Sequence, residues 1–260
     1  MLKAGVSTAC LYPKVIEEAL YDFALAGIEH VELFINSHSE IKRNFVLSMK
    51  DIMKRFDMTC SSVHPYTSEM EPMMLFSPYE RRVNDMIEYY KSFFSAMQLL
   101  DASVFVVHGN KPFGIPDNDL YFERFQRLVE VGKSFGIYVT LENVARCTSS
   151  SLNFLKQFCN ALGNDAFITL DIKQAVRSKE NPFTMLRELG SHIAHVHISD
   201  HGEYGDCLQI GKGHFAVKKF LKELSDVNPD CSVILELYRS GFSDVPDLAN
   251  NYQILSNMLR

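Results

Sequence analysis

The sequence predicts an α/β fold, a single (β/α)8 TIM barrel, and three observations support this prediction. Short apolar segments alternate with amphipathic segments along the whole chain, the pattern of parallel strands joined by helices. The length of 260 residues matches one barrel, which typically takes about 250 residues. Four apolar segments end in a carboxylate or an imidazole, as expected where the carboxyl ends of barrel strands surround a site. We therefore expect residues 1–260 to form one domain.

The first half of the chain is expected to contain four strand–helix units. The helical segments carry apolar residues at three- and four-residue spacing, and Gly27 ends the first of them. The predicted strands are residues 2–8, 30–35, 58–64 and 102–108, and the predicted helices are residues 14–26, 41–56, 80–100 and 120–135. Residues 67–78 form a polar loop that is long enough to lie over the barrel mouth as a lid or a wall.

The second half repeats the pattern four more times. Ser149 caps one helix, Gly163 ends it, Pro182 begins the next, and Asp244 caps the last. The predicted strands are residues 137–142, 167–171, 193–198 and 233–237, and the predicted helices are residues 149–162, 182–189, 216–224 and 245–259. A doubly wound open sheet is the alternative, but the first strand-to-helix turn lacks the glycine-rich phosphate motif of that fold.

Composition narrows the functional class. The net charge is −6 and no block rich in Lys and Arg interrupts the mixed surface, so nucleic acid is not an expected partner. The six cysteines are scattered without a C-x-x-C pair, which argues against a disulfide framework or a cysteine zinc site. The chain begins directly with a predicted strand and contains no long apolar run. We expect a cytoplasmic protein without a membrane partner that binds a small polar molecule.

Four residues at strand ends form the candidate site. Glu142, Asp171, His197 and Glu236 offer three carboxylates and one imidazole, a donor set that suits one divalent ion: Mn²⁺, Mg²⁺ or Co²⁺, with Zn²⁺ as a further option. Such an ion can polarise a sugar carbonyl and its neighbouring hydroxyl. Glu142 and Glu236 are then the expected catalytic pair. One removes a proton and the other delivers it through a metal-stabilised enediolate, which gives isomerisation or epimerisation. Each residue alone is equally explained as a polar group at the rim, but four together favour a site.

Seven short motifs carry a resemblance to a known family. They are Val63-His64-Pro65, Val106-Val107-His108-Gly109, Leu141-Glu142-Asn143, Leu170-Asp171, Val196-His197-Ile198-Ser199-Asp200, Gly211-Lys212-Gly213 and Leu235-Glu236. Over essentially its whole length the chain resembles the xylose isomerase-like superfamily, within it the sugar phosphate isomerase/epimerase group that includes tagatose/psicose epimerases, hydroxypyruvate isomerase and inosose dehydratase. The resemblance implies that Glu142, Asp171, His197 and Glu236 bind the metal. It also implies that His64 and His108 contact the substrate or support the ligands.

Departures from the family pattern bear on the substrate. Many relatives have a histidine where this chain has Gln174, which can still hydrogen-bond a sugar hydroxyl. The epimerases have an arginine at the position of Glu203, which argues against a free-ketose epimerase of that kind. Endonuclease IV-type relatives need an Asp-x-His where this chain reads Asp206-Cys207-Leu208, so abasic-site nuclease activity is not expected.

Two cations are candidates for contact with an anionic group of the substrate. Lys173 follows the sixth strand and Arg239 follows Glu236, although both are equally explained as solvated loop charges. His195 and His201 are expected to be packing or surface residues. The leading hypothesis is an isomerase or epimerase of a sugar or sugar phosphate, with a keto-inositol dehydratase-like lyase and a non-catalytic sugar-binding barrel as alternatives. A homo-oligomer is compatible with the sequence, which leaves the oligomeric state open.

Overall fold

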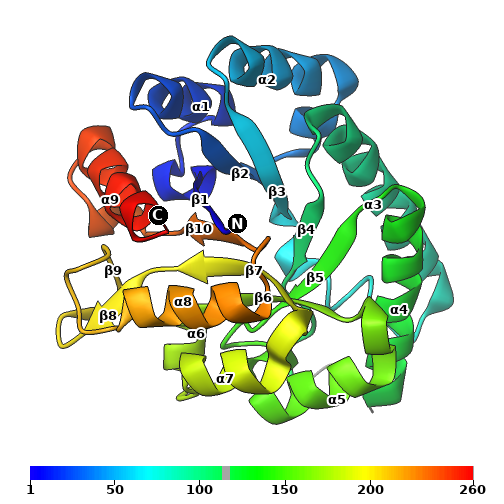
Figure 1. Ribbon diagram of the computed structural model, residues 1–260. Helices are drawn as coiled ribbons and strands as arrows, with labels where there is room; N and C mark the ends of the chain where they lie inside the picture. Colours follow the sequence, from blue (N-terminus) through cyan, green and yellow to red (C-terminus); the bar gives the residue numbers. More distant parts are fainter. Residues whose placement is uncertain (113–117, 260) are drawn as a thin grey trace.

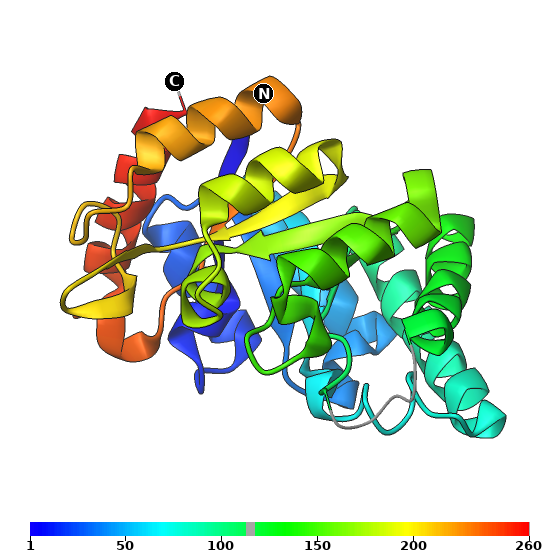
Figure 2. The same ribbon diagram turned by 90° about the horizontal axis from the view of Figure 1, so that it is seen from below.

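The computed structural model describes residues 1–112 and 118–259 and confirms the closed parallel barrel. Eight strands of the described chain follow one another around it in the order β1-β10-β7-β6-β5-β4-β3-β2, with the helices outside them (Figures 1 and 2). The barrel strands are β1 (Lys3–Ser7), β2 (His30–Ile35), β3 (Thr59–Pro65), β4 (Val104–Val107), β5 (Tyr138–Glu142), β6 (Phe167–Asp171), β7 (Ile193–Ile198) and β10 (Ser232–Leu235).

The connecting helices begin and end close to the predicted residues. Ser151, Asn181 and Asp244 cap three of them, because each side chain accepts a hydrogen bond from a backbone N–H in the first turn. These helices are α1 (Ile16–Leu25), α2 (Arg43–Arg55), α3 (Glu80–Leu100), α4 (Asn118–Ser134), α5 (Leu152–Leu162), α7 (Pro182–Leu189), α8 (Val217–Val227) and α9 (Val245–Met258).

The hydrophobic core lies between the barrel and the helices. Phe93 and Phe94 of α3 pack against Phe105 of β4, with ring centroids 5.7 and 5.2 Å apart. Because strand side chains alternate between the two faces, neighbours of these apolar residues point into the barrel, where the site is built. All six cysteines are buried and free, in agreement with the prediction.

Two elements of the second half were not predicted. The six-residue helix α6 (Ile172–Arg177) starts directly at the end of β6, and an antiparallel pair, β8 (Asp200–Gly202) with β9 (Gly205–Leu208), follows β7. Both are too short to show a helical or strand period in the sequence. The Asp200 carboxylate accepts hydrogen bonds from the backbone N–H groups of Gly211 and Gly213, which fixes the Gly211-Lys212-Gly213 segment before α8.

The loop at residues 67–78 packs against neighbouring elements. Thr67 Oγ1 lies 2.9 Å from the Tyr90 hydroxyl of α3, and the Glu71 carboxylate accepts a hydrogen bond from Gly109 N after β4. The loop is therefore anchored beside the carboxyl ends of the strands, as a wall rather than a free lid. No helix in the described ranges combines the length and the apolar character needed to cross a bilayer.

Candidate metal centre

The carboxyl ends of neighbouring strands bring the predicted ligands together. Glu142 and Asp171 are the last residues of β5 and β6, His197 lies opposite Asp171 in the register of β6 and β7, and Glu236 directly follows β10. Glu142, Asp171 and His197 offer ligand atoms within 4.8 Å of one another. His197 Nδ1 lies 3.4 Å from Glu142 Oε1 and 3.9 Å from both Asp171 Oδ2 and Glu236 Oε2. One imidazole nitrogen thus faces all three carboxylates.

Lys173 belongs to the same cluster. Its ammonium lies 2.7 Å from Glu236 Oε2 and 3.3 Å from Asp171 Oδ2, and only 5% of the residue is exposed. The first turn of α6 directs it there, because Asp171 caps this helix by accepting a hydrogen bond from Gln174 N. Lys173 is therefore neither a solvated loop charge nor a free cation, and it partly neutralises two of the predicted ligands.

Burial and neighbouring charges shift the pKa values of the three carboxyl groups in different directions. Burial raises the pKa of Asp171 to about 7. Burial also acts on Glu142, but the imidazoles around it, His108 first, hold its pKa well below the usual range. Burial is likewise outweighed at Glu236, whose pKa Lys173 and then His197 lower. The site therefore concentrates negative charge away from water, an arrangement that requires a compensating cation.

The donor set fits a divalent ion. Glu142 Oε2 and Asp171 Oδ2 are buried and accept no hydrogen bond from the described residues. Buried oxygens of this kind, with one imidazole nitrogen and no thiolate, are ligands for Mn²⁺, Mg²⁺, Co²⁺ or Zn²⁺. The unpartnered oxygens show that the residues present can hold a metal, without selecting among these ions.

His64 and His108 lie on the other side of Glu142. Their Nε2 atoms are 2.8 Å apart, and His108 Nε2 lies 3.0 Å from Glu142 Oε2. His64 Nδ1 lies 3.2 Å from the carbonyl oxygen of Pro65. Together with Glu142 the two histidines form another group of ligand atoms within 4.8 Å. They lie against the Glu142 carboxylate, and the roles that the resemblance implied for them, substrate contact or support of the ligands, stay predictions.

Gln174 and Arg239 are held by their own surroundings. Gln174 Oε1 accepts a hydrogen bond from Ala145 N and so links α6 to the turn after β5. The Arg239 guanidinium donates to the carbonyl oxygens of Phe242 and Ser243, at 2.9 and 3.1 Å, and stacks on the Phe242 ring. Substrate contact by either side chain stays a prediction, and Arg239 would first have to leave these partners.

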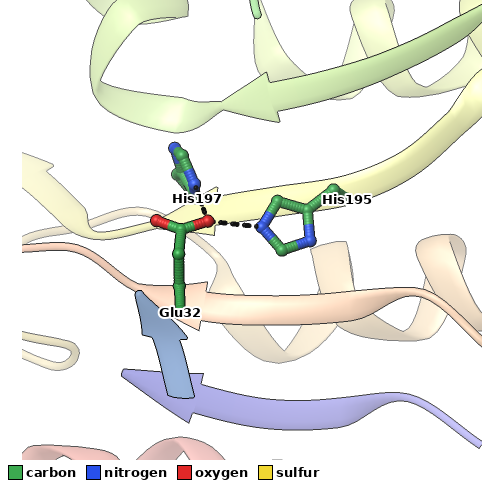
Figure 3. A group of neighbouring side chains, drawn as sticks. All are labelled: Glu32, His195 and His197. Atoms are coloured by element: carbon green, nitrogen blue, oxygen red, sulfur yellow. Dashed lines mark hydrogen bonds and ion pairs between the residues drawn. The ribbon is translucent and has the colours of Figure 1, made fainter. Parts of the chain in front are cut away.

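Glu32 was not among the predicted site residues, and His195 was expected to be a packing or surface residue. Both are fully buried, and Glu32 Oε2 lies 3.0 Å from His195 Nε2 and 3.0 Å from His197 Nε2 (Figure 3). The available signal was a glutamate in the middle of an otherwise apolar strand, a position where an unpaired charge is costly. His195 shares the inner face of β7 with His197, because side chains two residues apart point the same way.

A cavity of about 500 Å³ opens beside Glu236, one of the predicted ligands. Lys173 and Glu236 lie at its edge, and aromatic rings of Tyr12, Phe34 and Tyr66 form much of its wall. A larger cavity of about 750 Å³ lies at the opposite end of the barrel, beside the first residues of β1, β3 and β10, and its lining lacks the predicted ligands. Active sites of barrel enzymes lie at the carboxyl ends of the strands, so the smaller cavity is the candidate substrate site.

Comparisons with known proteins agree with the fold and identify a family. A family model described as "Xylose isomerase-like TIM barrel" matches residues 20–260. A D-tagatose 3-epimerase-like protein has a similar structure, with a TM-score of 0.80, 22% identity, and 99% of this chain and 97% of that chain covered.

Two further solved structures are similar. D-psicose 3-epimerase from Clostridium cellulolyticum H10, determined with D-tagatose, has a TM-score of 0.78 and 16% identity, with 99% and 98% of the two chains covered. The probable 3-DHS dehydratase AsbF of Bacillus anthracis has a TM-score of 0.78 and 15% identity, with 99% of each chain covered. At these identities the likeness establishes the fold.

Proposed function

The chain belongs to the xylose isomerase-like TIM-barrel family, and on this premise we propose that it is a divalent-metal-dependent isomerase or epimerase of a sugar. The observation that carries the proposal is the convergence of Glu142, Asp171 and Glu236 on His197 Nδ1 beside a cavity of about 500 Å³. Structural likeness to a D-psicose 3-epimerase and to a D-tagatose 3-epimerase-like protein supports the same class of reaction.

The four ligands would hold one divalent ion, which supplies a positive charge that polarises the substrate carbonyl. The chain itself supplies the proton transfer. Glu236 lines the cavity and its side chain is 16% exposed, so it can reach a substrate that Glu142, 3% exposed, meets from deeper in the barrel. Both carboxyl groups have lowered pKa values, for the reasons given above, and are therefore ionised and able to accept a proton at neutral pH.

Lys173 and His108 orient the two glutamates. Lys173 donates a hydrogen bond to Glu236 Oε2, and His108 Nε2 lies 3.0 Å from Glu142 Oε2. These neighbours limit the rotation of both carboxylates, which would then face the substrate or the ion in a fixed orientation. The proton removed by one carboxylate from the carbon next to the carbonyl is returned at a neighbouring carbon in an isomerase. In an epimerase the other carboxylate returns a proton to the opposite face of the same carbon.

The cavity favours an uncharged sugar over a sugar phosphate. Four of its nine lining residues are aromatic, and aromatic rings can pack against the C–H face of a sugar. Lys173 is the cation among the described lining residues, and it is committed to Glu236 and Asp171. A phosphate at this position would have to compete with two carboxylates for one ammonium group.

A metal-dependent lyase is the second candidate. The chain shares its fold with the probable 3-DHS dehydratase AsbF over 99% of both chains. Removal of a proton next to a carbonyl, followed by loss of hydroxide, would use the same carboxylates. The two functions differ in the product, because only the lyase loses water.

The experiment that tests the proposal is proton exchange in deuterated water. Purified protein with Mn²⁺ is incubated with a panel of ketoses, aldoses and their phosphates, and deuterium next to the carbonyl is measured together with the product. We expect exchange and a new isomer or epimer with an unphosphorylated sugar, and loss of both after chelation of the metal. Exchange with loss of water would establish the lyase, and no exchange with any sugar would refute both enzymes.

Two glutamate variants test whether the reaction takes place at the proposed site. Glu236→Gln removes the carboxylate that lines the cavity, whereas Glu203→Gln removes an exposed carboxylate between β8 and β9. We expect product formation to fall by about 10²–10⁴-fold in Glu236→Gln, because a general base is lost. Glu203→Gln should retain wild-type rates, and equal losses in the two variants would contradict the proposed site.

A further inference from the structure

Glu32 has a buried carboxylate, and three polar side-chain atoms lie within hydrogen-bonding distance of one of its oxygens. It lies on β2, 0% exposed, inside the barrel. Its Oε2 accepts a hydrogen bond from Ser62 Oγ at 2.8 Å and lies 3.0 Å from the Nε2 atoms of both His195 and His197 (Figure 3). A buried charge of this kind is costly without partners, and these three contacts offset that cost.

The two nitrogens of His197 point in opposite directions. Nε2 faces Glu32, while Nδ1 faces the carboxylates of Glu142, Asp171 and Glu236 at 3.4 to 3.9 Å. An ionised carboxylate can only accept hydrogen bonds, and Nε2 lies 3.0 Å from Glu32 whereas Nδ1 lies 3.4 Å or more from the other carboxylates, so Glu32 favours the neutral form of His197 with its proton on Nε2. The lone pair of the ring is then on Nδ1, where the predicted metal ligands converge.

We propose that Glu32 is a positioning residue that makes His197 a metal ligand, and that Ser62 and His195 in turn fix Glu32. The inference rests on the proposed metal-dependent function and adds to it a residue that supports one of the metal ligands. Glu32 sets the position of the proton on His197, restricts rotation of the ring, and increases the basicity of Nδ1. Carboxylate partners of metal-binding histidines generally act in this way, and their loss typically weakens metal binding by about 10–100-fold.

Strand register explains why this arrangement is rigid. Glu32 pairs with Ser62 between β2 and β3, and His197 pairs with Asp171 between β6 and β7. Each member of the chain of hydrogen bonds is therefore fixed by backbone pairing, and the carboxylate crosses the inside of the barrel to reach β7. The register of β2 and β3 shifts between Val31 and Glu32, directly before this pair. A side chain held by strand pairing keeps its orientation better than one on a loop.

Direct binding of an ion by Glu32, His195 and His197 is the competing explanation, because their ligand atoms also lie within 4.8 Å. The geometry favours hydrogen bonding. All three donors meet the same oxygen at 2.8 to 3.0 Å, which are ordinary hydrogen-bond lengths. An ion at Oε2 would have to displace these hydrogen bonds. Glu32 Oε1 and His195 Nδ1 are buried without a hydrogen-bond partner among the described residues, so the number of ions per chain decides between the two explanations.

The test compares Glu32→Gln with Glu71→Gln. Glutamine at position 32 keeps the shape of the side chain and removes its charge. Glu71 is also buried, but it bonds Gly109 N and the Tyr90 hydroxyl and has no contact with His197. For each folded, metal-free protein the dissociation constant of Mn²⁺ is measured by calorimetry, the number of ions per chain is counted, and the melting temperature is recorded.

We expect Glu32→Gln to bind Mn²⁺ about 10–100-fold more weakly than the wild type, with an unchanged stoichiometry of one ion. Glu71→Gln should stay within about threefold of the wild type, because burial raises the pKa of Glu71 to about 8 and the group is already neutral at pH 7. In Co²⁺-loaded protein, the exchangeable Nε2 proton of His197 should give one paramagnetically shifted proton resonance, which moves in Glu32→Gln. Loss of packing alone would lower the melting temperature without changing either metal readout.

Several outcomes would overturn the inference. Wild-type affinity in folded Glu32→Gln would remove Glu32 from metal binding. Two ions in the wild type and one in Glu32→Gln would make Glu32 a direct ligand instead. If Glu32→Gln does not fold, Ser62→Ala removes one donor to the same oxygen and should weaken Mn²⁺ binding in the same direction; wild-type affinity there would also refute the proposal. Absence of metal binding by the wild type would instead refute the proposed function.

Discussion

Replacement of Glu71 by glutamine should stabilise the protein at alkaline pH. The residue is 1% exposed; Glu71 Oε2 accepts a hydrogen bond from Gly109 N at 2.7 Å, and Oε1 lies 3.3 Å from the Tyr90 hydroxyl. That hydroxyl is also 2.9 Å from Thr67 Oγ1, so it can donate there and accept from a protonated Glu71. A glutamine amide reproduces the same pattern, with its oxygen at Gly109 and its NH₂ at Tyr90.

The magnitude follows from the pKa. Burial raises the pKa of Glu71 from its usual 4.5 to about 8. Between these values the folded chain retains a proton that the unfolded chain has lost, so the stability of the wild type falls as pH rises from about 4.5 to about 8. Each pH unit in this window lowers the free energy of unfolding by up to about 1.4 kcal/mol. Between pH 6 and pH 8 the loss is about 2–3 kcal/mol, or about 5–10 °C in melting temperature for a protein of this size.

The assay is thermal unfolding of both proteins at pH 6, 7 and 8, with a chelator present so that metal binding does not contribute. The melting temperature of Glu71→Gln, relative to the wild type, should rise with pH. Glu69→Gln is the matched control, because Glu69 is an exposed neighbour whose pKa is lowered by Lys111 and Arg146, and its relative stability should not rise. A difference between Glu71→Gln and wild type that stays constant with pH would refute the reasoning.

Three further predictions concern the site. Asp171→Ala and His197→Ala should each lower metal affinity and activity together. Their metal-free melting curves should stay close to that of the wild type, because barrel stability resides in the core layers. Unfolding of either variant would show that the residue has a structural role. Glu142→Gln and Glu236→Gln, assayed in saturating metal, should each lower turnover by about 10²–10⁴-fold, and one should still exchange the substrate proton with deuterium; full turnover in both would exclude the two-base mechanism. Lys173→Met removes a positive charge that lies 2.7 and 3.3 Å from two predicted ligand oxygens. In a calorimetric titration, Mn²⁺ affinity should therefore rise by about tenfold or more. Weaker binding would show that the lysine supports the metal site.

Local sequence determined the fold and part of the site. The helical period and the cap residues are contained in a few consecutive residues, which is why α7 (Pro182–Leu189) begins and ends as predicted. Parallel strands meet at their carboxyl ends, so Glu142, Asp171 and His197 could be placed together from strand order alone. The six-residue α6 and the pair β8–β9 contain too few residues to show a helical or strand period, so they were not predicted.

Tertiary structure alone decided which polar side chains become partners inside the barrel. Glu32 and His195 are 163 residues apart in the sequence. The residues next to each of them do not show whether its side chain has a partner inside the barrel. Lys173 and Arg239 both follow strand ends, yet the turn of α6 directs Lys173 to Asp171 and Glu236, while Arg239 bonds the carbonyl oxygens of its own loop. The physical reason is that a buried charge is stabilised by whichever donors the closed sheet brings within about 3 Å, and barrel closure sets those neighbours.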